Sequence, residues 1–187
     1  MQGEAILLRE GIGLSRGALR STSSRGVLAG RLVVLALAGT LALPSIAARA
    51  QDATWLANPT DTDLNNGANW STGTVPTGTA FFGASSITTL ELTSPGLQTM
   101  IDSWTFNTGA SNYTLNNLAT SQHLYFTGAG IVINGGSIAL QTSNGGGIDF
   151  QNASSAASAS ILNVVSAVNF SDTSTAADAS ILNQNAF

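Results

Sequence analysis

The apolar residues that follow residue 50 come in short bursts rather than in long periodic stretches. Each burst is three to seven residues long, is rich in β-branched and aromatic side chains, and is bounded by Gly, Asn, Ser or Pro. No window sustains the i, i+3, i+4, i+7 spacing of an amphipathic helix. The pattern therefore predicts many short β-strands, in bursts such as TAFFG, ITTLELT, SWTFN, YTLN, LYFTG, IVING, SIALQ, GIDFQ, ASILN and AVNFS.

Two of these bursts alternate strictly and lie 20 residues apart. In GIDFQN, Ile148 and Phe150 face one side of the expected strand and Asp149 faces the other, and AVNFSD repeats this arrangement. The whole block 147–166 aligns with 167–186. Four residues therefore recur at the same spacing: Phe150, Ile161, Leu162 and Asn163 return as Phe170, Ile181, Leu182 and Asn183.

A period near 20 residues with two or three short strands per unit predicts a solenoid. One coil cannot bury its apolar face alone, so coils must stack in parallel at a spacing of about 4.8 Å, with Phe over Phe. We predict an all-β, right-handed parallel β-helix in which Asn163 and Asn183 form an amide ladder. The roughly 137 residues after Ala50 give about seven coils, a rod of roughly 30 to 35 Å. A β-sandwich is the alternative, but its strands are not copies of one another.

The open ends of a solenoid expose unpaired strand edges and need a cap. Residues 51–83 are rich in Asn, Gly and Thr and contain Trp55 and Trp70, so they are the expected N-terminal cap. Residues 84–187 are the expected coils, with the period clearest over 147–187. The last letters, ILNQNAF, stop in mid-repeat, so we expect a truncated gene product or a fragment of a longer chain.

The first fifty residues have the pattern of an export signal. Arg31 precedes a 12-residue apolar run, 32–43, which is too short for the about 20 residues that a membrane-spanning helix needs. Pro44 then ends the helix, and ARA at 48–50 supplies the small residues of a signal-peptidase site. We predict an extended helical signal peptide over 1–50, cleaved after Ala50 to leave Gln51 first. A short buried helix of a cytosolic domain is the alternative.

The charge pattern changes at the same point in the chain. All six basic residues are Arg and lie within the first 50 positions, whereas eight acids and no base follow Ala50, a net charge of −8 there. Binding to nucleic acid or to anionic lipid needs Lys and Arg to neutralise phosphates, so neither partner is expected. The chain has no Cys, which excludes disulfides and thiol chemistry.

The segment ATWLANPTDTDLNNGANWSTGTVPTGTAFFGASS, with its Trp, polar loop, NW pair and VP-x-G turn, resembles the start of autotransporter passenger domains. The later units SIALQTSN, GIDFQNASSAASASILN and VNFSDTSTAADASILN resemble autotransporter-associated β-strand repeats. The resemblance implies type V secretion, a β-helical rod displayed outside the cell and a C-terminal outer-membrane barrel. Nothing after Gly147 has the strand series of a barrel, so the missing barrel is expected downstream of Phe187.

One loop carries part of the pattern of a calcium site. DTDLNN places Asp61, Asp63 and Asn65 at alternating positions, as an oxygen-ligand calcium loop does. Gly67 falls one position late, Thr72 stands where a bidentate Glu belongs, and Asn and Asp are ordinary turn formers. The single NGGGID segment is too isolated for a calcium repeat. We therefore expect a solvated turn, and no metal site.

Catalytic sites are not expected either. A sugar hydrolase needs paired carboxylates, but Asp149 aligns with Asn169 and Asp172 aligns with Asn152, so neither gains a second carboxylate. A lyase needs a cationic group, and none follows residue 50. His123 is the single His and has no triad partners near it in sequence, so we expect it to be a polar residue on one rung of the solenoid. Three aromatic residues are expected in the cap and core rather than stacked on sugars: Trp55, Trp70 and Trp104.

These patterns lead to a functional expectation without a reaction. We expect an exported structural or adhesive β-helix, with adhesion implied by the resemblance and no catalytic, cofactor-binding or metal-binding residues. The expected location is the cell surface, the outer membrane or the extracellular space. The expected partners are host or surface glycans, or further copies of the chain. The alternatives are a carbohydrate-active β-helix enzyme and a non-functional fragment.

Overall fold

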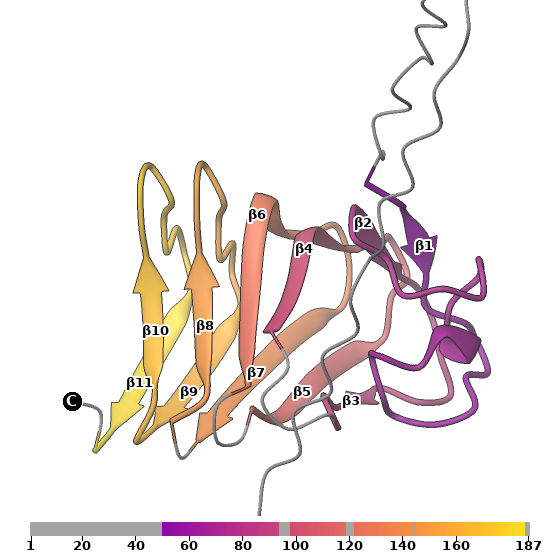
Figure 1. Cartoon of the computed structure of the whole chain (residues 1–187), viewed down its shortest axis with the longest axis horizontal. Helices are drawn as coiled ribbons and strands as arrows, with labels where there is room; N and C mark the ends of the chain where they lie inside the picture. Colours follow the sequence, from indigo (N-terminus) through magenta and orange to yellow (C-terminus); the bar gives the residue numbers. More distant parts are fainter. Residues whose placement is uncertain (1–49, 94–97, 119–121, 144, 186–187) are drawn as a thin grey trace, which may run out of the picture. The chain divides into compact units, whose positions relative to one another are not determined.

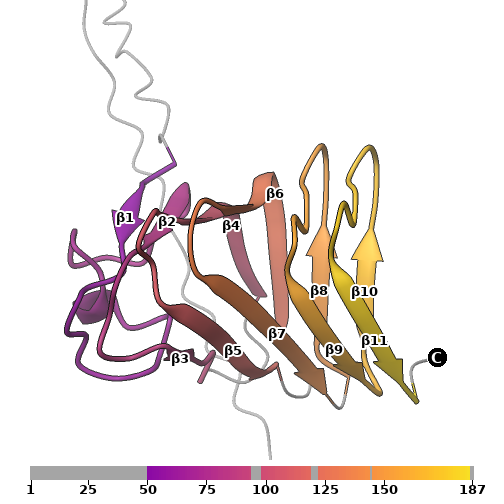
Figure 2. The same ribbon diagram turned by 180° about the vertical axis from the view of Figure 1, so that it is seen from behind.

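The apolar bursts form short strands that belong alternately to two parallel β-sheets (Figure 1 and, from behind, Figure 2). The computed structural model describes residues 50–93, 98–118, 122–143 and 145–185. The predicted signal peptide, up to residue 49, lies outside the described residues. Within the described ranges, no helix is long and apolar enough to cross a bilayer.

The first sheet, here sheet I, has the strand order β1-β2-β4-β6-β8-β10, and sheet II has the order β11-β9-β7-β5-β3. One 3₁₀ helix, η1 (Gly67–Asn69), precedes β2. The strands of sheet I are β1 (Ala53–Thr54), β2 (Thr79–Phe82), β4 (Gln98–Phe106), β6 (His123–Ile133), β8 (Gly147–Phe150) and β10 (Ala167–Phe170). Those of sheet II are β3 (Thr89–Leu90), β5 (Asn112–Leu118), β7 (Ser137–Ser143), β9 (Ser160–Val164) and β11 (Ser180–Gln184).

Each turn of the chain adds one strand to each sheet, and the paired strands are parallel. This is the predicted all-β solenoid, and the alternative β-sandwich is therefore wrong. The structure contains about five turns, so the expectation of about seven is also wrong. The reason lies in the earlier turns, which are longer than 20 residues. Gln98 pairs with His123 and Ser103 with Gly130, whereas Gly147 pairs with Ala167 as the repeat predicts.

Like side chains stack along the inside of the solenoid. Phe150 and Phe170 are partners in register, and their rings are parallel within 7° at a centroid distance of 4.9 Å. Phe126 stacks on Phe150 at 5.0 Å, and a second stack joins Phe82 to Phe106 at 4.9 Å. The predicted stacking of Phe over Phe is therefore confirmed. These buried rings contribute both apolar burial and favourable ring contacts to the stability of the stack.

A polar ladder runs along sheet II, whereas the Phe stack belongs to sheet I. Asn163 is 3% exposed, and its Nδ2 donates to Asn183 Oδ1 at 3.0 Å, as the repeat predicts. Thr142 extends the ladder by one turn, because its hydroxyl donates to Asn163 Oδ1 at 2.7 Å. The Asn163 amide also donates to the Ser166 carbonyl. Buried amides are costly unless they are hydrogen-bonded, and stacking amide on amide satisfies them.

The last two turns are copies even in their loops. Loops 151–159 and 171–179 rise above β8 and β10 in Figure 1, and Thr173 N donates to Asn152 O at 2.9 Å between them. Residues with positive φ recur 20 positions apart, as the pairs Asn152 and Asp172, Ala157 and Ala177, and Val165 and Asn185. The register is thus held along the whole turn, corners included.

The N-terminal end of the stack is covered by aromatic side chains. Trp55 and Trp70 are 1% and 3% exposed and meet edge to face at 5.2 Å, and Trp70 also contacts Phe82. Their ring N–H groups donate to the Ile87 and Leu64 carbonyls. Residues of the expected cap region therefore close the core at this end, while β1 and β2 of the same region already belong to sheet I.

Val165 is a strained position that the repeat itself identifies. Its φ is 51°, a left-handed conformation that β-branched residues disfavour, whereas Gly145 and Asn185 hold the same corner one turn before and after it. We expect Val165→Asn to raise the free energy of unfolding by about 1 kcal/mol in urea denaturation. The matched reverse change, Gly145→Val, should lower it, although the added Cβ meets nothing within 4 Å. A loss of stability in Val165→Asn would contradict this interpretation.

The Phe stack should carry more stability in its interior than at its last ring. Phe150 is fully buried between two rings, whereas Phe170 is only partly buried. We expect Phe150→Ala to cost about 3 to 5 kcal/mol in the free energy of unfolding, and Phe170→Ala clearly less. Thermal and urea unfolding of the two variants measure the difference. Equal losses would show that the stack does not act through burial.

Candidate functional site

The loop that carries the calcium-like pattern is held together by its own hydrogen bonds. Asp61 accepts from Asp63 N at 2.9 Å and from the side-chain amides of Asn66 at 2.7 Å and Asn69 at 2.6 Å. Asp63 accepts from Asn65 N at 3.0 Å, and its other oxygen accepts from the hydroxyl of Thr93, which follows β3, at 2.6 Å. The two bonds from backbone N–H groups are those of ordinary Asx turns, and the other three join side chains. Within the described ranges, no three His, Asp or Glu residues are close enough to hold a metal ion.

Asn69 is the centre of this loop. It is fully buried, its Oδ1 accepts from the backbone and hydroxyl of Thr60, and its Nδ2 donates to Asp61 and to the Asp63 carbonyl. The Asn69 amide, then the Asp63 N–H and the Asn66 amide, hold the pKa of Asp61 below its ordinary value of 3.8. The exposed carboxylate therefore has a structural use in its ionised form.

The two acids considered for sugar hydrolysis lie in different parts of a turn. Asp149 is on β8 and faces Asn169, whose amide donates to it at 2.8 Å. Asp172 lies in the loop above β10 and accepts from Asn152 N at 3.0 Å. The sequence alignment of the two turns thus placed both acids correctly. The register neighbours of Asp149 are Tyr125 and Asn169, neither of which is a carboxylate.

His123 has a partner that the sequence did not reveal. It begins β6 and its Nδ1 lies 3.1 Å from Asp149 Oδ2 on the next turn. Its register partner is Gly147, where a Cβ would come within 2.7 Å of the imidazole, so the missing side chain makes room for the ring. The ring also lies nearly parallel to Tyr125, with centroids 5.7 Å apart. His123 therefore lies on a solenoid strand as a polar residue, and its acidic partner comes from the next turn.

A row of side chains on the outer face of sheet I contains this pair. Successive strands β4, β6, β8 and β10 place four residues in register, Met100, Tyr125, Asp149 and Asn169. His123 lies beside the row, and we call these five residues the outer row. Met100 is 57% exposed, whereas the side chains of His123 and Asp149 are 30% and 15% exposed. The outer row is thus a partly open surface whose residues differ from turn to turn.

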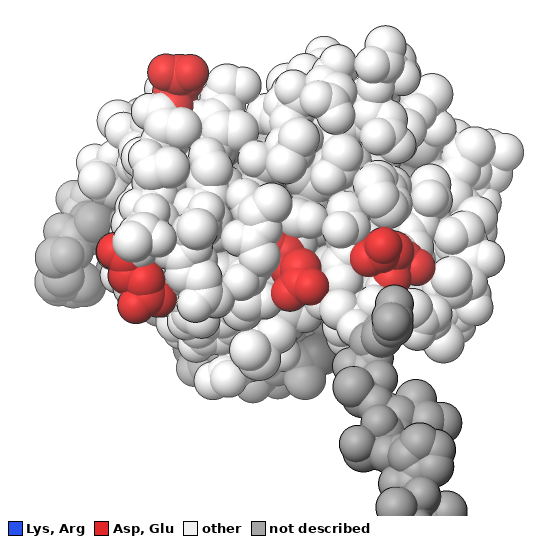
Figure 3. Space-filling model, turned by 90° about the horizontal axis from the view of Figure 1, so that it is seen from above, with Lys and Arg blue, Asp and Glu red and all other residues white. Residues whose placement is uncertain are grey.

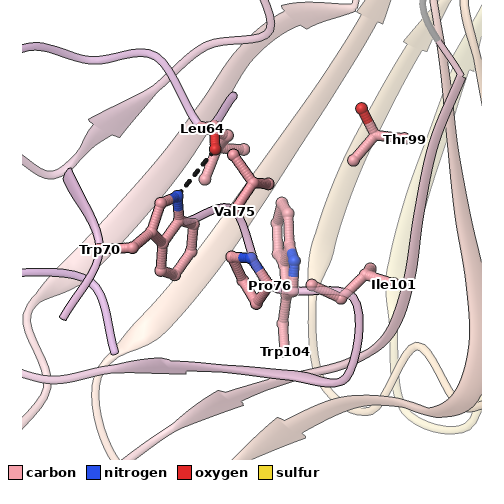
Figure 4. A pocket seen from close by; sticks show the side chains of 7 residues that line it. All are labelled: Leu64, Trp70, Val75, Pro76, Thr99, Ile101 and Trp104. Carbon is pink, nitrogen blue, oxygen red and sulfur yellow. Dashed lines mark hydrogen bonds between the residues drawn. The ribbon is translucent and has the colours of Figure 1, made fainter. Parts of the chain in front are cut away.

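The Trp side chains do not offer rings to a ligand. Trp55, Trp70 and Trp104 are 1%, 3% and 2% exposed, so all three pack in the core. A small cleft opens beside Trp70 and Trp104 (Figure 4), where the ring N–H of Trp70 donates to the Leu64 carbonyl. Its other walls are apolar apart from Thr99. Among the described residues the Thr99 hydroxyl has no partner, which leaves one polar group to orient a ligand.

The ionisable side chains after residue 50, apart from His123 and Tyr, are all acidic. All basic residues precede residue 50, and the acids seen in Figure 3 lie apart from one another on an otherwise uncharged surface. Within the described ranges the ion pair found joins His123 to Asp149 and depends on protonation of the imidazole. Hydroxyls and amides therefore make up most of what a partner would contact.

Comparison of the chain with family models, with curated proteins and with solved structures finds no match. The outer row and the solenoid that displays it are therefore the observations on which a functional argument must rest.

The Asp61 loop gives a pH prediction. Because the folded pKa is lowered, the ionised carboxylate stabilises the fold above its ordinary value of 3.8, and this contribution is lost as pH falls through the lower folded value. We expect the melting temperature of wild type to fall below about pH 4, and that of Asp61→Asn to fall less. The control is Asp178→Asn, an exposed loop acid. If this control flattens the profile equally, the loop is not the cause.

Proposed function

We propose that this chain is the exported passenger region of an autotransporter-like bacterial protein and acts at the cell surface as a structural or adhesive rod. The observation that carries the proposal is the parallel solenoid, in which each turn adds one strand to each of two sheets. Such a stack presents long rows of side chains at fixed spacing, which suits repeated weak contacts. We propose a right-handed coil, the hand that parallel crossovers favour.

The composition of the surface supports a role outside the cytoplasm. The chain after residue 50 has no Lys, Arg or Cys, and its surface is wetted mainly by hydroxyls and amides. A rod of this kind interacts through hydrogen bonds and does not depend on the redox state of its surroundings. The 12-residue apolar run and the ARA site supply the export signal of the proposal, with cleavage after Ala50 and an outer-membrane barrel encoded downstream.

The export step is tested by expressing the full chain with its downstream region in a diderm bacterium. We expect protease added to intact cells to digest the protein, and N-terminal sequencing of the mature chain to begin at Gln51. Val34→Arg, placed within the apolar run, should hold the chain in the cytoplasm because a charge there opposes insertion into the export channel. Mature protein that still carries Arg31 would refute the signal peptide.

The adhesive role is tested separately. Deleting the gene should lower attachment of cells to surfaces and to one another, and supplying the gene back should restore it. The purified chain should release no sugar from polysaccharides. Unchanged attachment after deletion, or sugar release that is lost in Asp149→Asn, would contradict an adhesive rod and favour the enzyme alternative.

A further inference from the structure

We propose that the outer row of sheet I is a binding face for a neutral polysaccharide chain lying along the solenoid axis. The inference rests on the proposed adhesive function and names the class of ligand and the residues that meet it. The outer row consists of Met100, Tyr125, Asp149 and Asn169 on successive strands, with His123 beside them. These strands, β4, β6, β8 and β10, lie side by side in Figures 1 and 2.

The row is arranged before any ligand arrives. One Asp149 oxygen lies 3.1 Å from His123 Nδ1, and the other accepts from Asn169 Nδ2 at 2.8 Å. The missing side chain of Gly147 lets the imidazole lie across β8. Side chains that already hold one another lose little further conformational freedom on binding, which lowers one of the costs of association.

The chemistry left free on the row matches sugar hydroxyls. Each Asp149 oxygen has a second lone pair, and Asn169 keeps one N–H and its carbonyl oxygen. Among the described residues, neither His123 Nε2 nor the Tyr125 hydroxyl has a hydrogen-bond partner. Sugar hydroxyls both donate and accept, so they can meet carboxylate, amide, imidazole and phenol groups in one row.

The row also offers apolar contacts of the right kind. The Tyr125 and His123 rings are nearly parallel at 5.7 Å, and Met100, at the end of the row, is 57% exposed. The C–H faces of pyranose rings pack on such groups, since aromatic and thioether side chains present broad polarizable surface. Four strands at about 4.8 Å extend the row over about 14 Å, enough for a few linked sugar units.

The charge of the face selects among polysaccharides. The described residues contain no Lys or Arg, and Asp149 stands in the middle of the row. Uronic acid or sulfated polymers would bring negative charge to a carboxylate with no cation but a protonated His123 to offset it. A neutral chain avoids this repulsion, so the geometry and the charge together favour neutral glycans.

The test measures binding of the full 187-residue chain to defined hexasaccharides by calorimetry and glycan array. The neutral probes are cellohexaose, maltohexaose and chitohexaose, and hexagalacturonate is the anionic comparator. We expect wild type to bind at least one neutral probe and to prefer it to hexagalacturonate. Tyr125→Ala and Asp149→Ala should each weaken binding about tenfold or more, because they remove the ring and the central acceptor.

Two further variants keep the test specific. Tyr125→Phe keeps the ring and should retain most of the binding. Gln141→Ala changes a partly exposed residue of β7 on sheet II and should leave binding unchanged. Circular dichroism and melting temperature establish that each variant is folded, and Asn169→Ala replaces Asp149→Ala if the latter does not fold. Folded wild type that binds no neutral probe, or equal loss in Gln141→Ala, would overturn the proposal.

Failure of this inference and failure of the adhesive function give different results. If deleting the gene lowers attachment but Tyr125→Ala cells attach normally, and the neutral hexasaccharides do not compete, the rod is adhesive and the outer row is not its glycan site. If deletion leaves attachment unchanged while the purified chain binds a neutral hexasaccharide through Tyr125, the binding face stands and the adhesive function is wrong.

Discussion

The fold depends on the register between successive turns, because one slipped residue would turn the inner side chains of a strand outward. The register is fixed twice in each of the last turns, by ring on ring at Phe150 and Phe170 and by amide on amide at Asn163 and Asn183. The Phe stack supplies apolar burial. The amide ladder disfavours a slipped register, because slipping would leave buried polar groups without hydrogen-bond partners. Apolar contact therefore stabilises the stack, and hydrogen bonding specifies which turn position meets which.

The part of the fold that could be predicted is the part where neighbouring turns have nearly the same sequence. Between 147 and 184 the chain repeats every 20 residues, so the pairing of Phe150 with Phe170 follows directly from the sequence. Earlier turns differ in length, and the bulge between Ile101 and Ser103 changes the offset within a single strand pair. Where successive turns do not share residues at a fixed spacing, the sequence pattern shows neither the spacing between paired residues nor the number of turns.

The candidate site was hidden for the same reason. The pairing of Asp149 with Asn169 falls within the exact repeat and could be predicted, whereas His123 and Tyr125 belong to the preceding turn, whose offset differs. Gly147 gives no sign in the sequence that its missing Cβ makes room for an imidazole. The calcium-like loop is a different case, since alternating acids that resemble a ligand set locally accept N–H groups of their own turn, as expected of turn-forming Asp and Asn.

The inward and outward faces of a strand in sheet I are under different packing constraints, and this difference indicates which face can carry function. In the later turns one inward position of sheet I holds the same residue, as Phe126, Phe150 and Phe170, where a change in one ring would disturb the packing of its neighbours. Outward positions are less restricted by packing, and Met100, Tyr125 and Asp149 differ from turn to turn. A solenoid can thus change what it binds one turn at a time while keeping its fold.

The outward polar residues of this chain form a connected row rather than isolated groups, since hydrogen bonds link His123, Asp149 and Asn169 across three strands. Such linkage holds the side chains in place before a ligand binds, which favours recognition.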